Sequence, residues 1–567
     1  MKTVSVLCSI MVLLAGELPS ISNAQQQPNT AMKASFVDEL EDLFPDSEVP
    51  DPCVKMFGVD VPRRGIAGVH ILLNGLEVGQ DLFFSVSTCE MVKADTLWWY
   101  RLVDVPVEQN TGLAGRLGND NLHVIRRAPF RVFDALEPVA SPIQIKTAVT
   151  VLRLEIPIAP DDKPGRRDYT ITLKCGRQIQ NLTYVVNVHK AILPVVGKES
   201  FPFTNWFSLA NMAEYHRLKP WSEEHWTMIG KYARLMVRGR QNTFLLGLNV
   251  IFDKQDDSRY ILNPRRLRRL VKVFTDAGMY YIEGGHLAFR TNGEWASKTF
   301  SLMEHSGTGP LATSREGNKV LAHVCRQLME EIEANGWRDR WLQHAADEPI
   351  ESHAADYRIL VGMIRKYMPG IPIIDANMEL TMRSIHLYGA LDIWCPKPNS
   401  YEQFRQAYEE MRALGDSVWF YTCLDPRGAH LNRLLDQERM RPMLIGWFAS
   451  MYGLDGFLHW GLNQYRFSQQ DKNPIDPFQQ TIKGNLPPGD THVIYPGPDG
   501  PWSSTRLEAH RLGFEDYDLL KMLKVTNPER AKAIIKKIIR SSSDYIKNPK
   551  SYRALRRELL EALGFSL

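Results

Sequence analysis

The chain has 567 residues, with 68 Lys and Arg against 65 Asp and Glu, which gives a formal charge of +3, and 44% of its residues are hydrophobic. This is the composition of an ordinary globular protein, long enough for more than one domain. The nearly balanced charge argues against the concentrated positive field that nucleic acid or an anionic membrane surface requires, so we expect neither as a partner.

The N-terminus has the pattern of a secretory signal. Lys2 precedes an apolar run over residues 4–15, and the small-x-small sequence Ser-Asn-Ala occupies residues 22–24. This pattern predicts a signal peptide over residues 1–24 and a secreted or periplasmic mature protein. No later stretch approaches the ~20 apolar residues of a membrane span. A signal that is not cleaved and anchors the protein is the alternative.

Two regions of different character follow. Residues 25–55 begin with Gln and Pro and end in an acidic stretch, which predicts a linker or loose arm. Residues 56–195 contain short runs such as HILLNGL, LFFSVST, VTVLRLEI and LTYVVNV, separated by turn residues. Several successive strands without an intervening helix predict a β-sandwich domain.

Residues 196–525 alternate between strand-like and helix-like patterns. Four of the helical stretches end at a glycine, with the next strand close behind, as short αβ loops require. Eight such alternations predict a (β/α)8 TIM barrel, and residues 526–567 are expected to add two packed C-terminal helices. The eight expected strands cover residues 201–207, 242–248, 280–285, 341–348, 372–378, 391–396, 417–424 and 456–463.

In such a barrel the chemistry lies at the carboxyl ends of the strands. Those ends carry carboxylates, amides and flat aromatic rings, which suit the hydroxyls and the apolar face of a sugar. The loop after the last strand, with Tyr495, is also expected to reach the pocket. The candidate residues at the strand ends are Asn205, Trp206, Glu283, Asp347, Glu348, Asn377, Trp394, Tyr421, Asp425, His459, Trp460 and Asn463.

Asp347 and Glu348 are the sharpest feature, because they end an apolar strand just before Pro349. Neighbouring strand residues point to opposite faces, so this pair does not fit a separated acid and nucleophile acting on one bond. We expect a division of labour in which Glu348 is the general acid and Asp347 stays ionised and holds a polar substrate group. Substrate-assisted glycosidases, in which the sugar's 2-acetamido oxygen is the nucleophile, need this arrangement.

Three segments resemble glycoside hydrolase family 123 and the broader group with the domain of unknown function 4091. They are HAADEP, HWGLNQY and GDTHVIYPGPDGPWSSTRLEAHRLGFEDYDLL, the last over residues 489–520. The resemblance covers roughly residues 200–525 and implies a sandwich domain before the barrel. It also implies a β-N-acetylgalactosaminidase in which Asp347 orients the acetamido group and Glu348 is the acid/base. By the same analogy Trp394, Tyr421, Trp460 and Asn463 line the pocket, and Tyr421 donates to the acetamido oxygen.

Three other functions are compatible with the sequence. A glycosidase of two-carboxylate type would pair Glu348 with Glu283 or Asp425, and a catalytically silent carbohydrate-binding protein or an enzyme for another sugar is also compatible. Glu283 is expected to contact substrate, to support Asp347, or to have a structural role. No zinc, dinucleotide or phosphate-binding motif stands in its required context, so no metal or cofactor is expected. The charged residues over 506–516 are expected to form a solvated, ion-paired helix.

Overall fold

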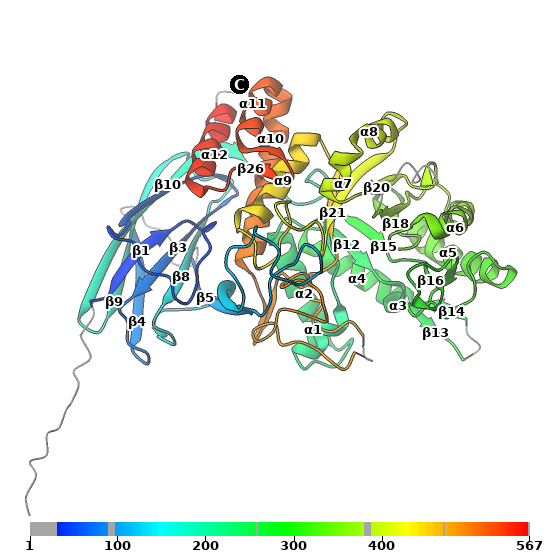
Figure 1. The fold of residues 1–567 in the computed structure, drawn as a ribbon, viewed down its shortest axis with the longest axis horizontal. Coiled ribbons are helices and arrows are strands. Elements are labelled where there is room, and N and C mark those ends of the chain that lie inside the picture. Colours follow the sequence, from blue (N-terminus) through cyan, green and yellow to red (C-terminus); the bar gives the residue numbers. More distant parts are fainter. Residues whose placement is uncertain (1–30, 89–96, 257–258, 379–386, 469–470, 565–567) are drawn as a thin grey trace, which may run out of the picture.

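The computed structural model describes residues 31–88, 97–256, 259–378, 387–468 and 471–564. The predicted signal peptide lies outside these residues. The described chain begins with a β-rich domain, continues into a larger domain of strands and helices, and ends in helices that lie near both (Figure 1). Cys395 and Cys423 are free, buried thiols.

The β-rich domain is a sandwich of two five-stranded sheets. The first has the order β1 (Lys33–Val37), β3 (Ile66–Asn74), β8 (Thr150–Pro157), β5 (Trp98–Val107) and β6 (Phe130–Pro138). The second has the order β2 (Met56–Arg63), β10 (Gln178–Ile192), β9 (Gly165–Cys175), β4 (Asp81–Thr88) and β7 (Ile143–Gln144). Buried side chains of both sheets, including Ile71, Leu154 and Ile171, form one core between them. The predicted sandwich is therefore present.

The prediction of a loose arm over residues 25–55 is wrong for part of that segment. Strand β1 pairs antiparallel with β3, and its alternate residues Ala34 and Phe36 are buried in the sandwich core. Just beyond it, Glu39 accepts a hydrogen bond from Arg153 at 2.6 Å with both side chains buried. Two apolar residues at a spacing of two are too short a signal to outweigh the acidic composition around them.

The larger domain contains the eight predicted strands, all parallel to their neighbours. They form two sheets, one with the order β12-β15-β18 and one with the order β11-β22-β21-β20-β19. A parallel bridge between Gln343 and Ile373 links the two sheets. The strands are β11 (Phe203–Asn205), β12 (Thr243–Leu246), β15 (Tyr281–Gly284), β18 (Trp341–Gln343), β19 (Ile374–Ala376), β20 (Ile393–Cys395), β21 (Ser417–Thr422) and β22 (Gly456–His459).

Helices and short hairpins connect these strands. The helices are α1 (Leu209–Tyr215), α2 (Glu223–Arg238), α3 (Leu248–Ile251), α4 (Pro264–Ala277), α5 (Arg315–Ala334), α6 (Ala354–Tyr367), α7 (Pro398–Gln403), α8 (Arg405–Ala413), α9 (Met440–Tyr452) and α10 (Thr505–Thr526). The hairpins are β13 (Phe252–Lys254) with β14 (Tyr260–Leu262), β16 (Ala288–Arg290) with β17 (Phe300–Leu302), and β23 (Tyr495–Gly497) with β24 (Gly500–Trp502). As expected, α4 and α9 end at Gly278 and Gly453, whose positive φ angles stop the helix.

Alternation along each strand decides which side chains can reach the site. On β21, Trp419 and Tyr421 belong to a cluster formed by side chains of the parallel strands, whereas Val418 and Phe420 pack in the larger core with the helices. A side chain that is shifted by one residue along a strand therefore points away from this cluster and toward the helices.

Helix α10 is buried on every side over residues 505–516, which corrects the expected solvated helix. The charged residues of this part, from Arg506 to Asp516, are all buried. Arg511 bonds Glu508 at 2.8 Å and Glu515 at 2.6 Å, and Glu508 also bonds Arg238 of α2 at 2.9 Å. Helix α10 packs on α9 and touches β6 of the sandwich. Charges at helical spacing look the same in sequence whether water or other charges surround them, and here ion pairs replace water.

The C-terminal segment forms the two predicted helices, α11 (Pro528–Ile538) and α12 (Pro549–Gly564), with a hairpin of β25 (Ile539–Ser541) and β26 (Asp544–Tyr545) between them. Figure 1 shows them in red, with α12 over the sandwich strands. Arg556 donates to the Asp60 carbonyl at 2.9 Å and to Asp516 of α10 at 2.8 Å. One arginine thus links the sandwich to the larger domain.

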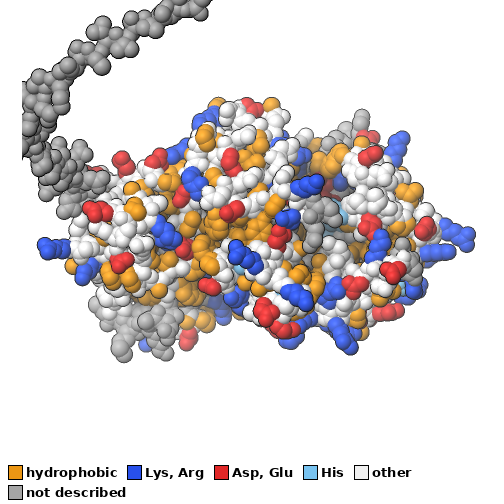
Figure 2. All heavy atoms as spheres, turned by 90° about the horizontal axis from the view of Figure 1, so that it is seen from below, with side chains coloured by type: hydrophobic (Ala, Val, Ile, Leu, Met, Phe, Trp, Pro, Cys, Tyr) orange, Lys and Arg blue, Asp and Glu red, His pale blue; other side chains and the backbone are white. Residues whose placement is uncertain are grey.

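The face shown in Figure 2 carries Lys and Arg side chains interspersed with Asp and Glu around a central group of hydrophobic side chains. Neither sign of charge dominates this face. Among the described residues, none of the helices combines the length and the apolar character needed to cross a bilayer.

Candidate active site

A cavity of about 540 Å³ opens beyond the carboxyl ends of the parallel strands. Trp206 follows β11, His286 follows β15, Asp347 follows β18 and Trp460 follows β22, so four strand ends contribute to one site. The complete lining consists of Trp206, Phe207, Leu245, His286, Phe289, Arg290, Gly293, Trp295, His305, Asp347, Trp460, Gln464 and Phe467.

Asp347 is the one carboxylate among the described residues that line this cavity. Its side chain is 45% exposed, although the surrounding protein still restricts its hydration. That partial burial, together with the charge of Glu348, raises the pKa of Asp347 to about 7. A carboxyl that changes its charge near neutral pH inside a cavity is a candidate for chemistry.

Glu348 lies beside Asp347, with its backbone in the left-handed region at φ 45°. This conformation is costly for a residue with a Cβ, and it is typical of functional sites that the surrounding structure holds in place. Arg290 donates to the Glu348 carbonyl at 2.8 Å, and the Tyr421 hydroxyl donates to Glu348 Oε1 at 2.6 Å. The backbone carbonyl and the side-chain carboxylate of Glu348 are therefore each held by a hydrogen bond.

The two carboxylates do not alternate across a regular strand, as the sequence suggested. Strand β18 ends at Gln343, because the backbone N–H groups of Ala345 and Ala346 bond the side chain of Asp375 at 3.1 Å each instead of a neighbouring strand. The chain then bends over residues 346–348. Asp347 and Glu348 both act electrostatically on Arg290 and on Tyr421, so the pair serves one site.

A buried relay of hydrogen bonds lies beneath Asp347. His344 bonds Glu283 through Nε2 at 2.6 Å and Asp375 through Nδ1 at 2.8 Å. Burial opposes a charged imidazole, but these two hydrogen bonds outweigh it and raise the pKa of His344 to about 10. His344 is therefore an imidazolium held between two carboxylates at neutral pH.

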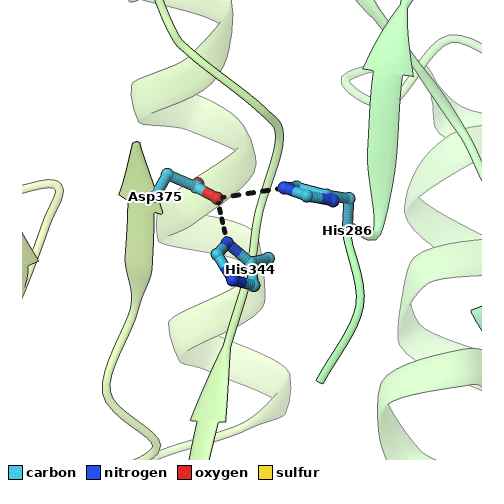
Figure 3. A group of neighbouring side chains, drawn as sticks. All are labelled: His286, His344 and Asp375. Atoms are coloured by element: carbon cyan, nitrogen blue, oxygen red, sulfur yellow. Dashed lines mark hydrogen bonds and ion pairs between the residues drawn. The ribbon is translucent and has the colours of Figure 1, made fainter. Parts of the chain in front are cut away.

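His286 connects this relay to the cavity. Its Nε2 atom is buried without a hydrogen-bond partner, 3.8 Å from Asp375 Oδ1 and 4.0 Å from Asp347 Oδ1. Burial, followed by the charge of His344, lowers the pKa of His286 well below its usual value, so its ring is neutral. Figure 3 shows His286 and His344 both directed at Asp375.

These three side chains have atoms close enough to hold a metal ion. However, both ring nitrogens of His344 already bond carboxylates, and an ion would have to displace one of those bonds. A metal site built from His344, Asp347 and Glu348 meets the same obstacle, because Nε2 of His344 already bonds Glu283. The hydrogen bonds of His344 to Asp375 and Glu283 therefore fit a chain of groups that holds a proton better than they fit a metal site.

Comparison with known proteins identifies the family. The family model described as the catalytic domain of glycoside hydrolase 123 matches residues 206–523. The chain belongs to glycoside hydrolase family 123. The fold is similar to that in a structure titled as the analysis of glycolipid glycan hydrolysis by a family 123 enzyme from Clostridium perfringens, with 13% identity, 94% of this chain and 99% of that chain covered, and a TM-score of 0.73.

Two further solved structures are much less similar. A family 39 glycoside hydrolase from Bacteroides cellulosilyticus WH2 has 11% identity and a TM-score of 0.33, covering 77% of this chain and 80% of its own. A β-galactosidase from Marinomonas ef1 has 10% identity and a TM-score of 0.36, covering 59% and 62%. No curated protein matches this sequence.

In this family 123 glycoside hydrolase, the two predicted tryptophans Trp206 and Trp460 line the cavity. Trp206 donates through its indole N–H to Glu283 at 2.9 Å, and Trp460 donates to Asp490 at 3.3 Å. Glu283 itself is fully buried and also accepts from Thr204 at 2.8 Å. It therefore supports the wall of the site and does not line it.

Three predicted amides lie outside the cavity of the family 123 enzyme and have structural partners. Asn205 accepts from Arg433 at 2.6 Å. Asn377 donates to the Tyr408 hydroxyl at 2.8 Å, and Asn463 bonds the backbone N–H of Ser208 at 2.8 Å. All three amides are buried. A polar residue at a strand end can cap the backbone of a neighbouring segment as readily as it can bind a ligand.

Trp394 and Tyr495, also predicted to bind substrate, lie elsewhere. Trp394 belongs to the core with the helices, and its indole donates to Asp416 at 2.8 Å, because its place on β20 points it outward. The Tyr495 hydroxyl donates to Asp134 of the sandwich at 2.7 Å. The loop of Tyr495 therefore contributes to the contact between the two domains.

The sequence analysis missed the outer wall of the cavity, formed by Arg290, Trp295, His305 and Phe467. The first three come from the hairpin of β16 and β17 and the turn after it, which is inserted between β15 and α5. No periodic pattern marks such a loop as part of a site. His286 could have been found, since it directly follows the end of β15.

Proposed function

We propose that this family 123 enzyme is a secreted, retaining hydrolase that releases terminal β-linked N-acetylhexosamine, with N-acetylgalactosamine as the sugar, from a glycoconjugate. The observation that carries the proposal is the pair Asp347 and Glu348, with Asp347 lining an aromatic cavity and Glu348 held beside it. The fold it shares with an enzyme described as hydrolysing glycolipid glycans supports a glycolipid or related glycan as substrate.

In the first step the carbonyl oxygen of the 2-acetamido group attacks the anomeric carbon and the glycosidic bond breaks. Glu348 gives its proton to the departing oxygen, and ionised Asp347 orients the acetamido N–H and stabilises the positive charge that develops on the ring. In the second step Glu348 takes a proton from water as that water opens the oxazolinium-like intermediate. Two displacements at one carbon restore the original configuration.

Trp206 and Trp460 fit the role of a stacking surface for the sugar, since indole faces match the apolar C–H face of a pyranose. Tyr421 was expected to donate to the acetamido oxygen. In the free enzyme its hydroxyl is engaged with Glu348 instead, so we propose that it positions the acid/base group. Donation to the substrate would first require that hydrogen bond to break.

The two-carboxylate alternative has less support. Glu283 is buried and bonded to Thr204, Trp206 and His344, so it is not free to attack a sugar. Asp425 bonds Arg427 at 2.7 Å and does not line the cavity.

We also propose that the parallel strands close into a (β/α)8 barrel. The bridge between Gln343 and Ile373 supports one junction of the two sheets. At the other junction the Asn242 N–H, just before β12, donates to the carbonyl of Phe203 on β11 at 3.3 Å. The N-terminal pattern supports residues 1–24 as the export signal.

A panel of nitrophenyl β-glycosides tests the function. It should include gluco and galacto sugars, each with and without the 2-acetamido group. We expect cleavage only of the acetamido sugars, with the galacto form preferred. Equal cleavage of sugars that lack the group would support a two-carboxylate enzyme, and sugar binding without any turnover would support a carbohydrate-binding protein.

A further inference from the structure

Arg290 is an unusual cation in this cavity, because much of its hydrogen-bonding capacity is unused. It ends strand β16, and its guanidinium carbon lies 3.9 Å from the centre of the Trp295 ring. One terminal nitrogen donates to the Glu348 carbonyl at 2.8 Å. Its Nε atom is buried and has no hydrogen-bond partner. A guanidinium has five N–H donors, so several of those on Arg290 have no acceptor among the residues that the structure describes.

The charge of Arg290 is also not neutralised by a direct ion pair. Within the described chain, no carboxylate oxygen lies within 4.0 Å of this guanidinium, and Asp347 and Glu348 act on it only from farther away. Other buried arginines differ: Arg153 contacts Glu39 at 2.6 Å and Glu155 at 2.7 Å. A partly buried guanidinium without a counter-ion is costly unless a ligand supplies one.

The surroundings of Arg290 suit a sugar that carries a charge. Trp295 is 48% exposed and Phe467 is 51% exposed, and both line the cavity beside it. His305, another exposed residue of the lining, can add a donor on the same side. The guanidinium carbon lies over the Trp295 ring, and a guanidinium in such a place can still offer two parallel hydrogen bonds to an oxyanion.

We propose that Arg290, which lies over the Trp295 ring, binds an anionic oxygen group of the glycan, a sulfate ester or a sugar carboxylate, so that the preferred substrates are acidic glycoconjugates. This inference rests on the proposed function and narrows its substrate class. The bond to the Glu348 carbonyl also couples occupancy of this subsite to the backbone of the acid/base residue.

The test compares kcat/KM for nitrophenyl β-N-acetylgalactosaminide with that for its 4-O-sulfated and 6-O-sulfated forms, and for a disaccharide in which the same sugar is β-linked to a uronic acid. The sulfated and uronic arms separate the two sources of the anion. We expect the wild type to prefer at least one acidic substrate by about 10- to 100-fold, the range for a charge-assisted hydrogen bond. Arg290→Gln should remove that preference.

Two further variants make the result decisive. Arg268→Gln, at an exposed arginine on α4 that pairs with Glu331, should keep the full preference. Arg290→Lys keeps the charge but not the planar fork, so its preference should fall between those of the wild type and Arg290→Gln. If Arg290→Gln does not fold, the lysine variant still decides, because a full preference in it would contradict bidentate binding.

Calorimetry can measure how tightly the enzyme binds free N-acetylgalactosamine 6-sulfate and the neutral sugar. This measurement separates the inference from the proposed function. Selective binding of the sulfated sugar that is lost in Arg290→Gln would support the subsite even if no acetamido glycoside were hydrolysed. Hydrolysis of the neutral glycoside with equal rates for all acidic forms would overturn the subsite and leave the hydrolase intact. A preference that survives Arg290→Gln would also overturn it.

Discussion

The hydroxyl of Tyr421, on strand β21, donates a 2.6 Å hydrogen bond to Oε1 of Glu348, in the loop after β18. This contact joins two strand ends that are far apart in the sequence and fixes the carboxylate that we assign as acid/base. Arg290 donates to the carbonyl of the same residue, whose backbone is in the left-handed region. The backbone and the side chain of Glu348 are therefore each held by a hydrogen bond from another strand or hairpin.

Removal of either carboxylate should abolish most activity, in distinguishable ways. Asp347→Asn and Glu348→Gln should each lower kcat by at least ~100-fold, the low end for a positioned proton-transfer group. A leaving group of low pKa needs no protonation, so it should partly restore Glu348→Gln but not Asp347→Asn. Steady-state rates on a series of nitrophenyl and alkyl glycosides measure this. Equal restoration of both variants would contradict the assigned roles.

Tyr421→Phe removes the hydrogen bond that positions Glu348. We expect kcat to fall by about 10-fold with KM nearly unchanged, because a typical hydrogen bond contributes roughly 0.5–1.5 kcal/mol and a tenfold change corresponds to about 1.4 kcal/mol. Tyr408→Phe is a matched control, since its hydroxyl bonds Asn377 outside the cavity. An increase in KM alone for Tyr421→Phe would indicate a sugar contact in place of a positioning role.

The pH dependence of kcat/KM should report the ionisation of Asp347. The mechanism needs this carboxylate charged, and its pKa is raised to about 7 by burial and by Glu348. On the acidic side, activity should therefore fall about tenfold for each pH unit below about 7. An acidic limb centred near pH 4 would contradict the raised pKa.

Asp347→Asn should stabilise the fold at alkaline pH. A pKa raised from 3.8 in the unfolded chain to about 7 in the folded one means that the folded state disfavours the charged form. Stability is therefore lost as pH rises through that window. The variant should gain on the order of 1–2 kcal/mol at pH 8, less than the full shift implies because the side chain is 45% exposed, and little at pH 4.

Denaturant unfolding of wild type and Asp347→Asn at the two pH values measures this gain. Asp276→Asn, at an exposed residue of α4 that pairs with Lys272, is the matched control and should show no such pH-dependent gain. A variant that is less stable than the wild type at pH 8 would mean that Asp347 makes favourable contacts in the free enzyme.

Glu283→Ala distinguishes a supporting residue from a nucleophile. Loss of this carboxylate leaves the His344 imidazolium with one partner, so the free energy of unfolding should fall by roughly 3–5 kcal/mol, the cost of breaking a buried pair. Trp206 also loses its acceptor, and KM should rise. Azide should not restore activity. Formation of a glycosyl azide of inverted configuration would show that Glu283 is the nucleophile of a two-carboxylate enzyme.

The sequence predicted the order of elements well, because hydrophobic runs and glycine stops are local properties. All eight parallel strands and the sandwich follow from them. The sequence predicted less reliably which side chains at the strand ends face the cavity. Trp394 and Tyr421 both lie on predicted strands, yet only Tyr421 points inward, and this depends on the register of each strand.

Two other features depend on contacts between distant segments. The charges of α10 are buried because α9, the sandwich and α12 cover the helix, and no pattern within the helix indicates that. Arg290 and Trp295 reach the cavity through an inserted hairpin, whose path is set by its own turns and packing. Neither could be obtained from periodicity or composition.

The most direct test of substrate assistance varies the attacking oxygen and leaves the rest of the sugar unchanged. The measurement is kcat/KM for nitrophenyl β-N-acetylgalactosaminide and its analogues with fluoromethyl, difluoromethyl and trifluoromethyl in place of the acetyl methyl group. Each fluorine withdraws electrons from the carbonyl oxygen, so our account predicts a stepwise fall in rate across the series. A rate independent of fluorination would mean that the enzyme supplies the nucleophile, and would contradict the mechanism proposed for Asp347 and Glu348.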